Sequence, residues 1–268
     1  MRHGMERKRE PSAPDAPGFF IPCRHAGDTP RPPDAPGYAA VEALFRATEP
    51  SFAPILDRLA PGAPLPPADP PPRWGQDWFP SADAAALLAV LADRPPARIV
   101  EVGAGHSTRF FAAAAPQAEM RAIDPAPRAR LPERVALRAE PLSPAHAPLF
   151  EALAPGDVAS FDGSHILFPH TDVDLMLTAI LPVLKPGVLV HIHDVFLPDP
   201  YPPEWTWRGY GEQIGVAAWL LAGGLRPVFP VRYALTRMAG AARLPADPLA
   251  SSLWAVKTAP LAHAPAGS

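Results

Sequence analysis

The first third of the chain shows three different hydrophobic patterns. Residues 1–36 are rich in Pro, Gly and charged side chains and lack periodicity, so we expect a disordered or loosely ordered leader. Residues 38–60 carry apolar side chains at helical spacing, which predicts one or two helices interrupted near Pro50. Residues 61–74 read as a polyproline linker. We therefore expect a helical, Pro-rich extension over 37–80.

From Ser81 onward, short apolar runs alternate with helical patterns. Ser81 is a candidate N-cap for a helix over about 82–93. The expected strands read "ARIVEVG", "MRAIDP", "VALRAEPL", "VASFDGSH" and "VLVHIHDVF". Near-continuous apolar strands separated by helices predict a parallel sheet that is buried on both faces. Two further segments, "RPVFPVRYALTRM" and "SSLWAVKTA", have no helical pattern between them and should pair as an antiparallel hairpin. The main domain should thus span 81–260, followed by a tail at 261–268.

Composition narrows the cellular setting and the partners. The formal net charge of −3 and a pI near 6.3 give no strong field toward nucleic acid or membrane surfaces. The single cysteine, Cys23, excludes an intrachain disulfide and fits a reducing cytoplasm. No apolar run reaches the roughly 18 residues needed to span a bilayer, and the N-terminus lacks the apolar core of a signal peptide. We expect a cytoplasmic protein with a small-molecule partner; its oligomeric state stays open.

A glycine-rich turn follows the first expected strand and indicates a nucleotide site. Gly103 and Gly105 lie at the carboxyl end of that strand, where open α/β sheets bind ligands. Asp124 ends the next strand, about 20 residues later, where a ribose diol needs an acceptor. Both dinucleotides and S-adenosylmethionine use this pattern. Thr108 in place of the third glycine, the long segment before the strand and the terminal hairpin all favour S-adenosylmethionine.

The motifs taken together resemble a known family. "VEVGAGHSTRF", "AIDPAPR", "FDGSH", "LPVLKPGVLVHIHDVFLPDPYPPEW" and the closing hairpin are similar to class I S-adenosylmethionine-dependent methyltransferases. The likeness is greatest to the bacterial small-molecule branch with a Gly-x-Gly-x-Ser-Thr motif, and it covers about 81–259. It implies an α/β, Rossmann-like, seven-stranded sheet of order 3-2-1-4-5-7-6. Strand 7 would be antiparallel, with helices on both faces.

The resemblance also implies a set of cofactor-binding residues. Glu101 would face the methionine ammonium, the glycine turn would pass under the cofactor, and Asp124 would hold the ribose hydroxyls. Glu140, after the third strand, would lie near the adenine. Alternatives remain for each, because an ordinary βα turn also uses glycines, Asp124 precedes a proline, and Glu140 could be a solvated loop residue. The full set is Glu101, Gly103, Ala104, Gly105, Ser107, Asp124, Glu140 and Asp162.

The candidate catalytic residues follow the fourth and fifth strands. These are Asp162, His193 and Asp194, and together they could ligate Mg²⁺ or Mn²⁺. Metal-dependent methyltransferases of the catechol type place acids at these strand ends, but His193 departs from their pattern. In the metal-free alternative, His193 is a general base that Asp162 or Asp194 orients. A third interpretation makes the histidines structural, and His191, deeper in the strand, suits it best.

An aromatic, Pro-rich segment follows directly. Phe196, Tyr201 and Trp205 should form a lid or one wall of an acceptor pocket. The alternative is a loop that only covers the edge of the sheet.

The leading functional hypothesis is an S-adenosylmethionine-dependent methyltransferase that modifies a small molecule, in the first place at oxygen. Hydroxylase-like chemistry on the same fold and a catalytically silent cofactor-binding protein are the alternatives. A nicotinamide dehydrogenase is disfavoured by the missing third glycine. The acceptor itself cannot be identified from the sequence.

Overall fold

The computed structural model describes residues 18–19, 24–28, 35–92 and 94–259. The strands are β1 Arg98–Val102, β2 Glu119–Ile123, β3 Val135–Arg138, β4 Val158–Phe161, β5 Leu189–Ile192, β6 Leu225–Pro230 and β7 Leu253–Lys257. The α-helices are α1 Ala39–Thr48, α2 Ala53–Arg58, α3 Ser81–Ala92, α4 His106–Ala114, α5 Ala147–Glu151, α6 Asp172–Leu175, α7 Leu181–Val183, α8 Glu212–Leu221 and α9 Val231–Arg237. Short 3₁₀ segments are η1 Ala26–Asp28, η2 Glu49–Ser51, η3 Pro144–His146, η5 Pro203–Arg208 and η6 Ala239–Arg243, and η4 Met176–Ile180 is a π-helix.

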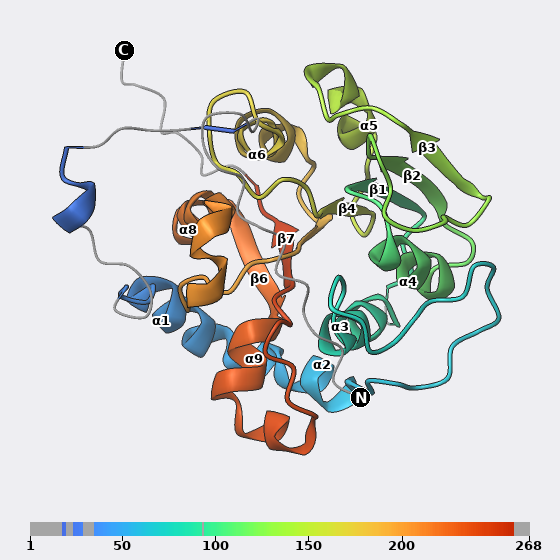
Figure 1. Cartoon of the computed structure of the whole chain (residues 1–268). Coiled ribbons are helices and arrows are strands. Elements are labelled where there is room, and N and C mark those ends of the chain that lie inside the picture. Colours follow the sequence, from blue (N-terminus) through green and yellow to red (C-terminus); the bar gives the residue numbers. More distant parts are fainter. Residues whose placement is uncertain (1–17, 20–23, 29–34, 93, 260–268) are drawn as a thin grey trace, which may run out of the picture.

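The seven strands form one sheet in the order β3-β2-β1-β4-β5-β7-β6 (Figure 1). Strands β1 to β5 pair in parallel, whereas β7 lies antiparallel to both β5 and β6. The predicted fold, strand order and antiparallel last strand are therefore confirmed. Because β1 and β4 are neighbours, the carboxyl ends that carry the candidate residues meet at one edge of the sheet.

The connection between β6 and β7 differs from the prediction. The two strands pair antiparallel, but they are joined by α9 and η6 rather than by a short hairpin loop. The segment expected to form a strand stops at Pro230 and continues as helix, with Val231, Tyr233 and Ala234 buried. The error has a physical reason: short apolar runs suit a strand or a buried helix equally well.

The N-terminal extension is built into the main core. Helices α1 and α2, interrupted at η2 as predicted near Pro50, lie beside α9 (Figure 1). The Phe45 ring lies 5.5 Å from Tyr233 and the Phe52 ring 6.4 Å from Phe229. These residues belong to the same buried cluster as the sheet. The extension is thus part of the folded domain.

The segments expected to be a linker and a leader contain little regular secondary structure among their described residues. In the Pro-rich segment 61–74, the Trp74 indole donates to the Ala63 carbonyl and packs against Phe110, so this segment is anchored. Most of the predicted leader 1–36 lies outside the described residues, as does the whole of the predicted tail 261–268. Of the leader, Phe19 contacts Phe168 with ring centroids 4.2 Å apart. Within the described part of the chain, no helix has the length and apolarity to cross a membrane.

Candidate active site

A cavity of about 790 Å³ opens at the carboxyl ends of β1, β2, β4 and β5. The glycine turn and Asp124 form one side of it. Asp162, His165, His193 and Asp194 form another. The cavity also includes Trp78 and Arg128, whose guanidinium carbon lies 4.0 Å from the indole centroid. Sequence analysis did not single out this cation–π pair, because its members are 50 residues apart.

The turn between β1 and α4 requires glycine at its first position. Gly103 has a φ of +78°, in the left-handed region that favours glycine. A Cβ atom there would lie 1.8 Å from the Asp162 carbonyl oxygen, so the ends of β1 and β4 could not approach each other. By contrast, a Cβ on Gly105 would meet only the Arg128 Cβ, at 3.9 Å. Space for a ligand therefore lies over Gly105.

Glu101 is a fully buried carboxyl group with an incomplete set of partners. Its Oε1 accepts a hydrogen bond of 2.6 Å from the Ser107 hydroxyl, but its Oε2 is buried and has no partner. Burial raises the pKa of Glu101 to about 8. An unsatisfied buried acceptor beside an open cradle is the chemistry that a cationic ammonium would complete. Glu101 itself does not line the cavity, although its neighbours Val102 and Gly103 and its partner Ser107 do, so its contact with the methionine ammonium stays a prediction.

The other predicted cofactor residues are divided. Asp124 lines the cavity and already accepts hydrogen bonds from the Ala104 and Ala126 amides, at 2.6 and 2.7 Å. Glu140 does not line the cavity, although its neighbours Pro141 and Leu142 do. Its carboxylate instead lies 3.1 Å from His146 Nε2. The expected adenine contact therefore has no support from the position of Glu140.

Two acids and two imidazoles form a closed ring at the ends of β4 and β5. The Nε2 atom of His165 lies 3.4 Å from Asp162 Oδ1 and 3.4 Å from Asp194 Oδ2. The Nδ1 atom of His193 lies 3.4 Å from Asp162 Oδ1 and 3.5 Å from Asp194 Oδ1. We call Asp162, His165, Asp194 and His193 the acid–imidazole ring. The predicted strand-end residues thus come together, and His165, from the same "FDGSH" motif as Asp162, joins them rather than lying in solvent.

Each imidazole of the ring has a third carboxylate, on its outer nitrogen. His193 Nε2 lies 3.2 Å from Asp83 Oδ2, and His165 Nδ1 lies 2.8 Å from Glu212 Oε2. Asp83 belongs to α3 and Glu212 begins α8, and both side chains are buried. Sequence analysis missed both residues, because they lie 110 and 47 positions from their histidines.

The backbone at the ring is bent so that all four side chains converge. Strand β5 ends at Ile192, and Asp194 takes a left-handed φ of 54°. His165 also has a left-handed φ, of 60°. Such conformations cost about 1–3 kcal/mol each in non-glycine residues and persist only where the surroundings enforce them. In a continuing strand, Asp194 would instead have pointed away from His193.

The charges of the ring shift its pKa values in opposite directions. Burial opposes the charge on His193, but the carboxylates of Asp162 and Asp194 raise its pKa well above the usual range. His165 shows the same balance, with Asp162, Glu212 and Asp194 raising its pKa. Burial alone would raise the pKa of Asp162, yet the two imidazoles, chiefly His193, lower it. The surrounding carboxylates therefore favour the protonated, cationic form of both imidazoles.

His191 has the structural role that its position suggested. Its Nδ1 lies 2.9 Å from the Ser160 hydroxyl and its Nε2 lies 3.0 Å from the Ser252 hydroxyl. Burial lowers the pKa of His191 to about 3, so the His191 imidazole is neutral. It does not line the cavity.

The expected metal site does not form in this arrangement. Within the described ranges, no set of three or more His, Cys, Asp or Glu side chains is placed to hold a metal ion. The carboxylates of Asp162 and Asp194 raise the pKa of His193, which favours the protonated imidazole, a form without a free lone pair for a metal. In this arrangement Asp162, His193 and Asp194 pair with one another.

The aromatic segment contributes one of its three predicted residues to the cavity. Trp205 lines the cavity with Glu204, Arg208 and Tyr210. Phe196 is buried beneath, 5.1 Å from the Trp205 ring, and Tyr201 packs against Tyr210 at 5.7 Å. The segment thus forms one wall of the cavity. Trp205 faces the cavity, and Phe196 and Tyr201 pack behind the wall.

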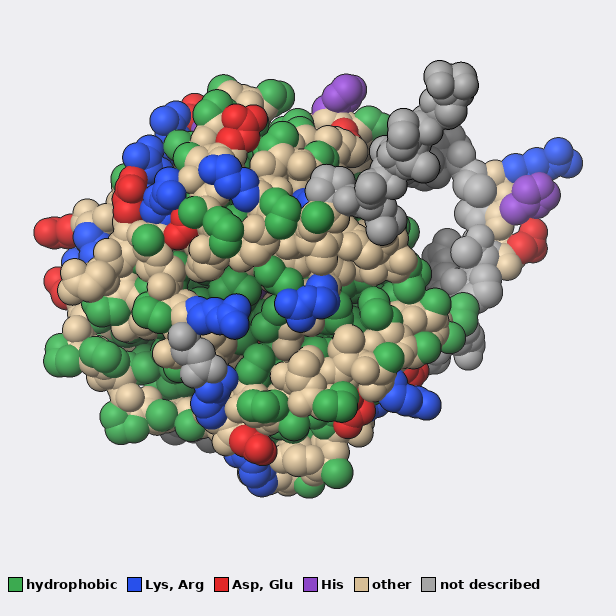
Figure 2. Space-filling model, turned by 180° about the vertical axis from the view of Figure 1, so that it is seen from behind, with side chains coloured by type: hydrophobic (Ala, Val, Ile, Leu, Met, Phe, Trp, Pro, Cys, Tyr) green, Lys and Arg blue, Asp and Glu red, His purple; other side chains and the backbone are tan. Residues whose placement is uncertain are grey.

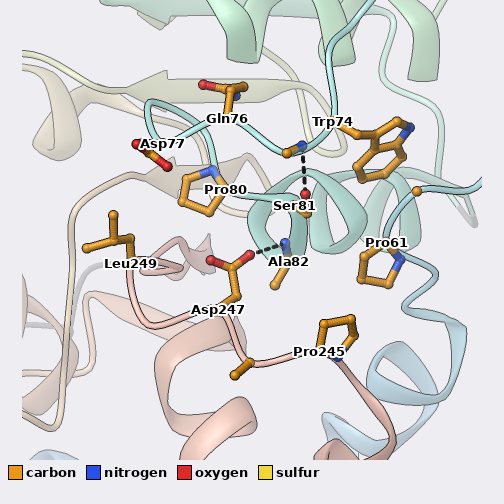
Figure 3. A pocket seen from close by; sticks show the side chains of 13 residues that line it. Pro61, Trp74, Gln76, Asp77, Pro80, Ser81, Ala82, Pro245, Asp247 and Leu249 are labelled. Carbon is orange, nitrogen blue, oxygen red and sulfur yellow. Dashed lines mark hydrogen bonds between the residues drawn. The ribbon is translucent and has the colours of Figure 1, made fainter. Parts of the chain in front are cut away.

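Figure 3 shows a second cavity, of about 570 Å³. Asp77 and Leu249 line both cavities. The Asp247 carboxylate accepts a hydrogen bond from the Ala82 amide, and the Ser81 hydroxyl accepts one from Gly75, so Ser81 does not act as the predicted N-cap. No residue of the acid–imidazole ring lines this second cavity.

Comparison with known proteins bears on the same segment. The family model described as a methyltransferase domain matches residues 100–195, from β1 to just beyond the ring. No curated protein matches the chain. Among solved structures, the MycE methyltransferase of the mycinamycin biosynthetic pathway, in complex with Mg and SAH, is 19% identical; 63% of this chain and 47% of that chain are covered, with a TM-score of 0.37. The present chain thus spans about half the length of MycE.

Two further solved structures are similar over more of their length. A putative methyltransferase from Thermobifida fusca YX is 15% identical, with 66% of this chain and 79% of that chain covered and a TM-score of 0.43. A DUF574 family protein from Streptomyces avermitilis is 16% identical, with 83% and 90% covered and a TM-score of 0.41. The family model thus places a methyltransferase domain at residues 100–195, and the strand order 3-2-1-4-5-7-6 is the one that the resemblance to class I, S-adenosylmethionine-dependent methyltransferases implies.

Proposed function

We propose that the protein transfers a methyl group from S-adenosylmethionine to an oxygen atom of a small-molecule acceptor, in the cytoplasm. One observation carries this proposal: the acid–imidazole ring and the glycine turn beside Glu101 open into the same cavity. A methyl donor held on the turn would therefore lie next to groups that can accept a proton. S-adenosylmethionine supplies a methyl group on a sulfonium, which needs no further activation.

The residues of the chain position the acceptor and remove its proton. We assign the base to His193, because its backbone amide is held 2.9 Å from the Phe161 carbonyl at the end of the sheet. The acceptor O–H proton passes to His193 Nδ1 in the deprotonated fraction of the enzyme. The oxygen then forms the bond to the methyl carbon while the carbon–sulfur bond breaks, and its electron pair stays on sulfur. Alignment of the two reactants is worth roughly 7–11 kcal/mol, and a positioned base adds about 10²–10⁴-fold.

A small acceptor suits the charges near the site better than a nucleic acid. Carboxylates crowd the reacting end of the cavity, and a phosphate backbone would be repelled there. On the face seen in Figure 2, basic and acidic side chains are interspersed and apolar side chains gather in the middle, without a continuous basic surface. Nucleic-acid-binding surfaces are typically a single basic patch or stripe.

A divalent metal is kept as the alternative to a free base, since the ring consists of ligand types that Mg²⁺ or Mn²⁺ can use. The two versions differ in a direct measurement. Chelation followed by re-addition of Mg²⁺ or Mn²⁺ should leave the activity unchanged if His193 acts alone. If chelation abolishes methyl transfer and the metal restores it, the metal version is correct.

The deciding experiment combines binding with turnover. Calorimetry should show that the protein binds S-adenosylhomocysteine more tightly than NAD. Labelled S-adenosylmethionine and an extract of the source cells should then yield a product heavier by one methylene group. His193→Ala should lower the rate by about 10²–10⁴-fold and leave S-adenosylhomocysteine affinity unchanged. Preferential NAD binding would overturn the proposal, whereas binding without any product would favour the silent alternative.

A further inference from the structure

The acid–imidazole ring is supported from outside by two buried carboxylates, Asp83 and Glu212. Asp83 and Glu212 are 0% and 2% exposed, among the most deeply buried ionisable side chains of the described residues. Neither lines the cavity, so neither can touch a substrate. Each makes one contact with an imidazole of the ring. Burying a carboxylate is costly unless its hydrogen bonds are satisfied, so these positions call for an explanation.

The two contacts have complementary geometry. Glu212 takes the Nδ1 atom of His165, whereas Asp83 takes the Nε2 atom of His193. In both cases the nitrogen held by the outer carboxylate is the one that points away from the cavity. The remaining nitrogens, His165 Nε2 and His193 Nδ1, both face Asp162 and Asp194. A hydrogen bond to one imidazole nitrogen fixes the ring orientation and decides which nitrogen keeps the proton.

Both outer carboxylates are themselves held rigidly. Asp83 accepts hydrogen bonds from the Ser251 and Ser252 amides, at 3.0 and 2.7 Å, where the chain enters β7. Glu212 begins α8, and the amides of Gly211 and Glu212 bind the His165 carbonyl, at 2.9 and 3.2 Å. The loop that carries His165 is thus tied to α8 through both its backbone and its side chain. This accounts for how His165 keeps its left-handed φ.

We propose that Asp83 and Glu212 are positioning residues for the methyl transfer, which fix His193 with Nδ1 inward and His165 with Nε2 inward. This inference rests on the proposed function of the cavity. In the neutral imidazole, the inward nitrogen then carries the lone pair, and a proton can be accepted only on the side of the substrate. Without the outer carboxylates, either ring could flip or take the other tautomer, with the lone pair pointing into the core.

The test uses the imidazole N–H protons, which are visible in ¹⁵N-labelled protein whether or not an acceptor is known. A buried N–H that donates to a carboxylate resonates far downfield of the amides. We expect one such signal from each outer N–H, that of His193 Nε2 and that of His165 Nδ1, assigned with His193→Gln and His165→Gln. Asp83→Asn should remove only the His193 signal, and Glu212→Gln only the His165 signal, so each variant controls for the other. Asp157→Asn is a further control, because this buried acid binds the Arg98 and Ala154 amides and no histidine.

A second experiment measures the rate of methyl transfer from labelled S-adenosylmethionine to acceptors in the cell extract. Glu212→Gln and Asp83→Asn should lower the rate by roughly 10- to 1,000-fold and leave S-adenosylhomocysteine affinity unchanged, whereas Asp157→Asn should keep the rate. Asp83→Asn also removes an acceptor from the Ser251 or Ser252 amide. The imidazole tautomers of the wild-type protein therefore provide a test that needs no substitution. Above the imidazole pKa values, His193 must retain the proton on Nε2 and His165 on Nδ1. The reverse tautomers, or signals unaffected by the substitutions, would overturn the inference. Failure to bind S-adenosylhomocysteine would overturn the proposed function. The N–H signals would still show whether Asp83 holds His193 and whether Glu212 holds His165.

Discussion

Glu101 illustrates how a single residue can lower stability and serve binding. Its pKa is raised from 4.5 to about 8 by burial, so the folded protein holds a proton that the unfolded chain releases. The contribution of this proton to the free energy of unfolding is fully present below pH 4.5. It falls as the pH rises and is lost once the pH passes about 8. Glu101→Gln lacks this titration. The free energy of unfolding of the wild type relative to the variant should therefore fall between these pH values, by at most about 1.4 kcal/mol per pH unit.

Urea unfolding of both proteins from pH 5 to 9 measures this difference. A constant difference over the whole interval would mean that Glu101 is already ionised in the fold. Binding should change in the opposite direction, because the cofactor ammonium would lose its charged partner. Calorimetry at pH 8 should show S-adenosylhomocysteine binding weakened by roughly 10–100-fold in Glu101→Gln.

At the scale of elements, the site depends on how closely β1 and β4 approach. Gly103→Ala places a Cβ against the Asp162 carbonyl and strains a left-handed residue, so it should both destabilise the fold and displace the acid–imidazole ring. Gly223→Ala is the matched control, because Gly223 has nearly the same φ, +75°, but nothing within 4 Å of the added Cβ. The control should cost about 1–2 kcal/mol from backbone strain alone. Gly103→Ala should cost clearly more in thermal denaturation and abolish S-adenosylhomocysteine binding. Equal losses would show that the two strand ends can move apart freely.

The same scale explains which parts of the molecule could be predicted from sequence. The buried parallel strands are short apolar runs with turn signals at both ends, and the glycine turn has a strict local requirement, so both are local patterns. The residues at the ends of β4 and β5 could be grouped because parallel strands align their carboxyl ends. Asp83, Glu212 and α9 could not be found in this way. Asp83 lies within a helix that otherwise reads as an apolar packing surface, and only the tertiary fold brings it to His193.

Considered as a whole, the molecule does not divide where the change of hydrophobic pattern near residue 81 suggested. Helices α1 and α2 place Val41, Phe45, Phe52 and Leu56 in the common core, each at most 2% exposed. Burying a large apolar side chain is worth about 1.5–3 kcal/mol, and a domain has a net stability of only about 5–15 kcal/mol. Deleting residues 1–60 should therefore abolish cooperative unfolding and S-adenosylhomocysteine binding together. The shorter deletion, of residues 1–36, is the control: among its described residues Phe19 is 58% exposed, and its removal should shift the melting temperature by no more than a few degrees. Calorimetric melting of both truncations decides the point. A folded, cofactor-binding protein that begins at residue 61 would mean that α1 and α2 only rest on a domain complete without them.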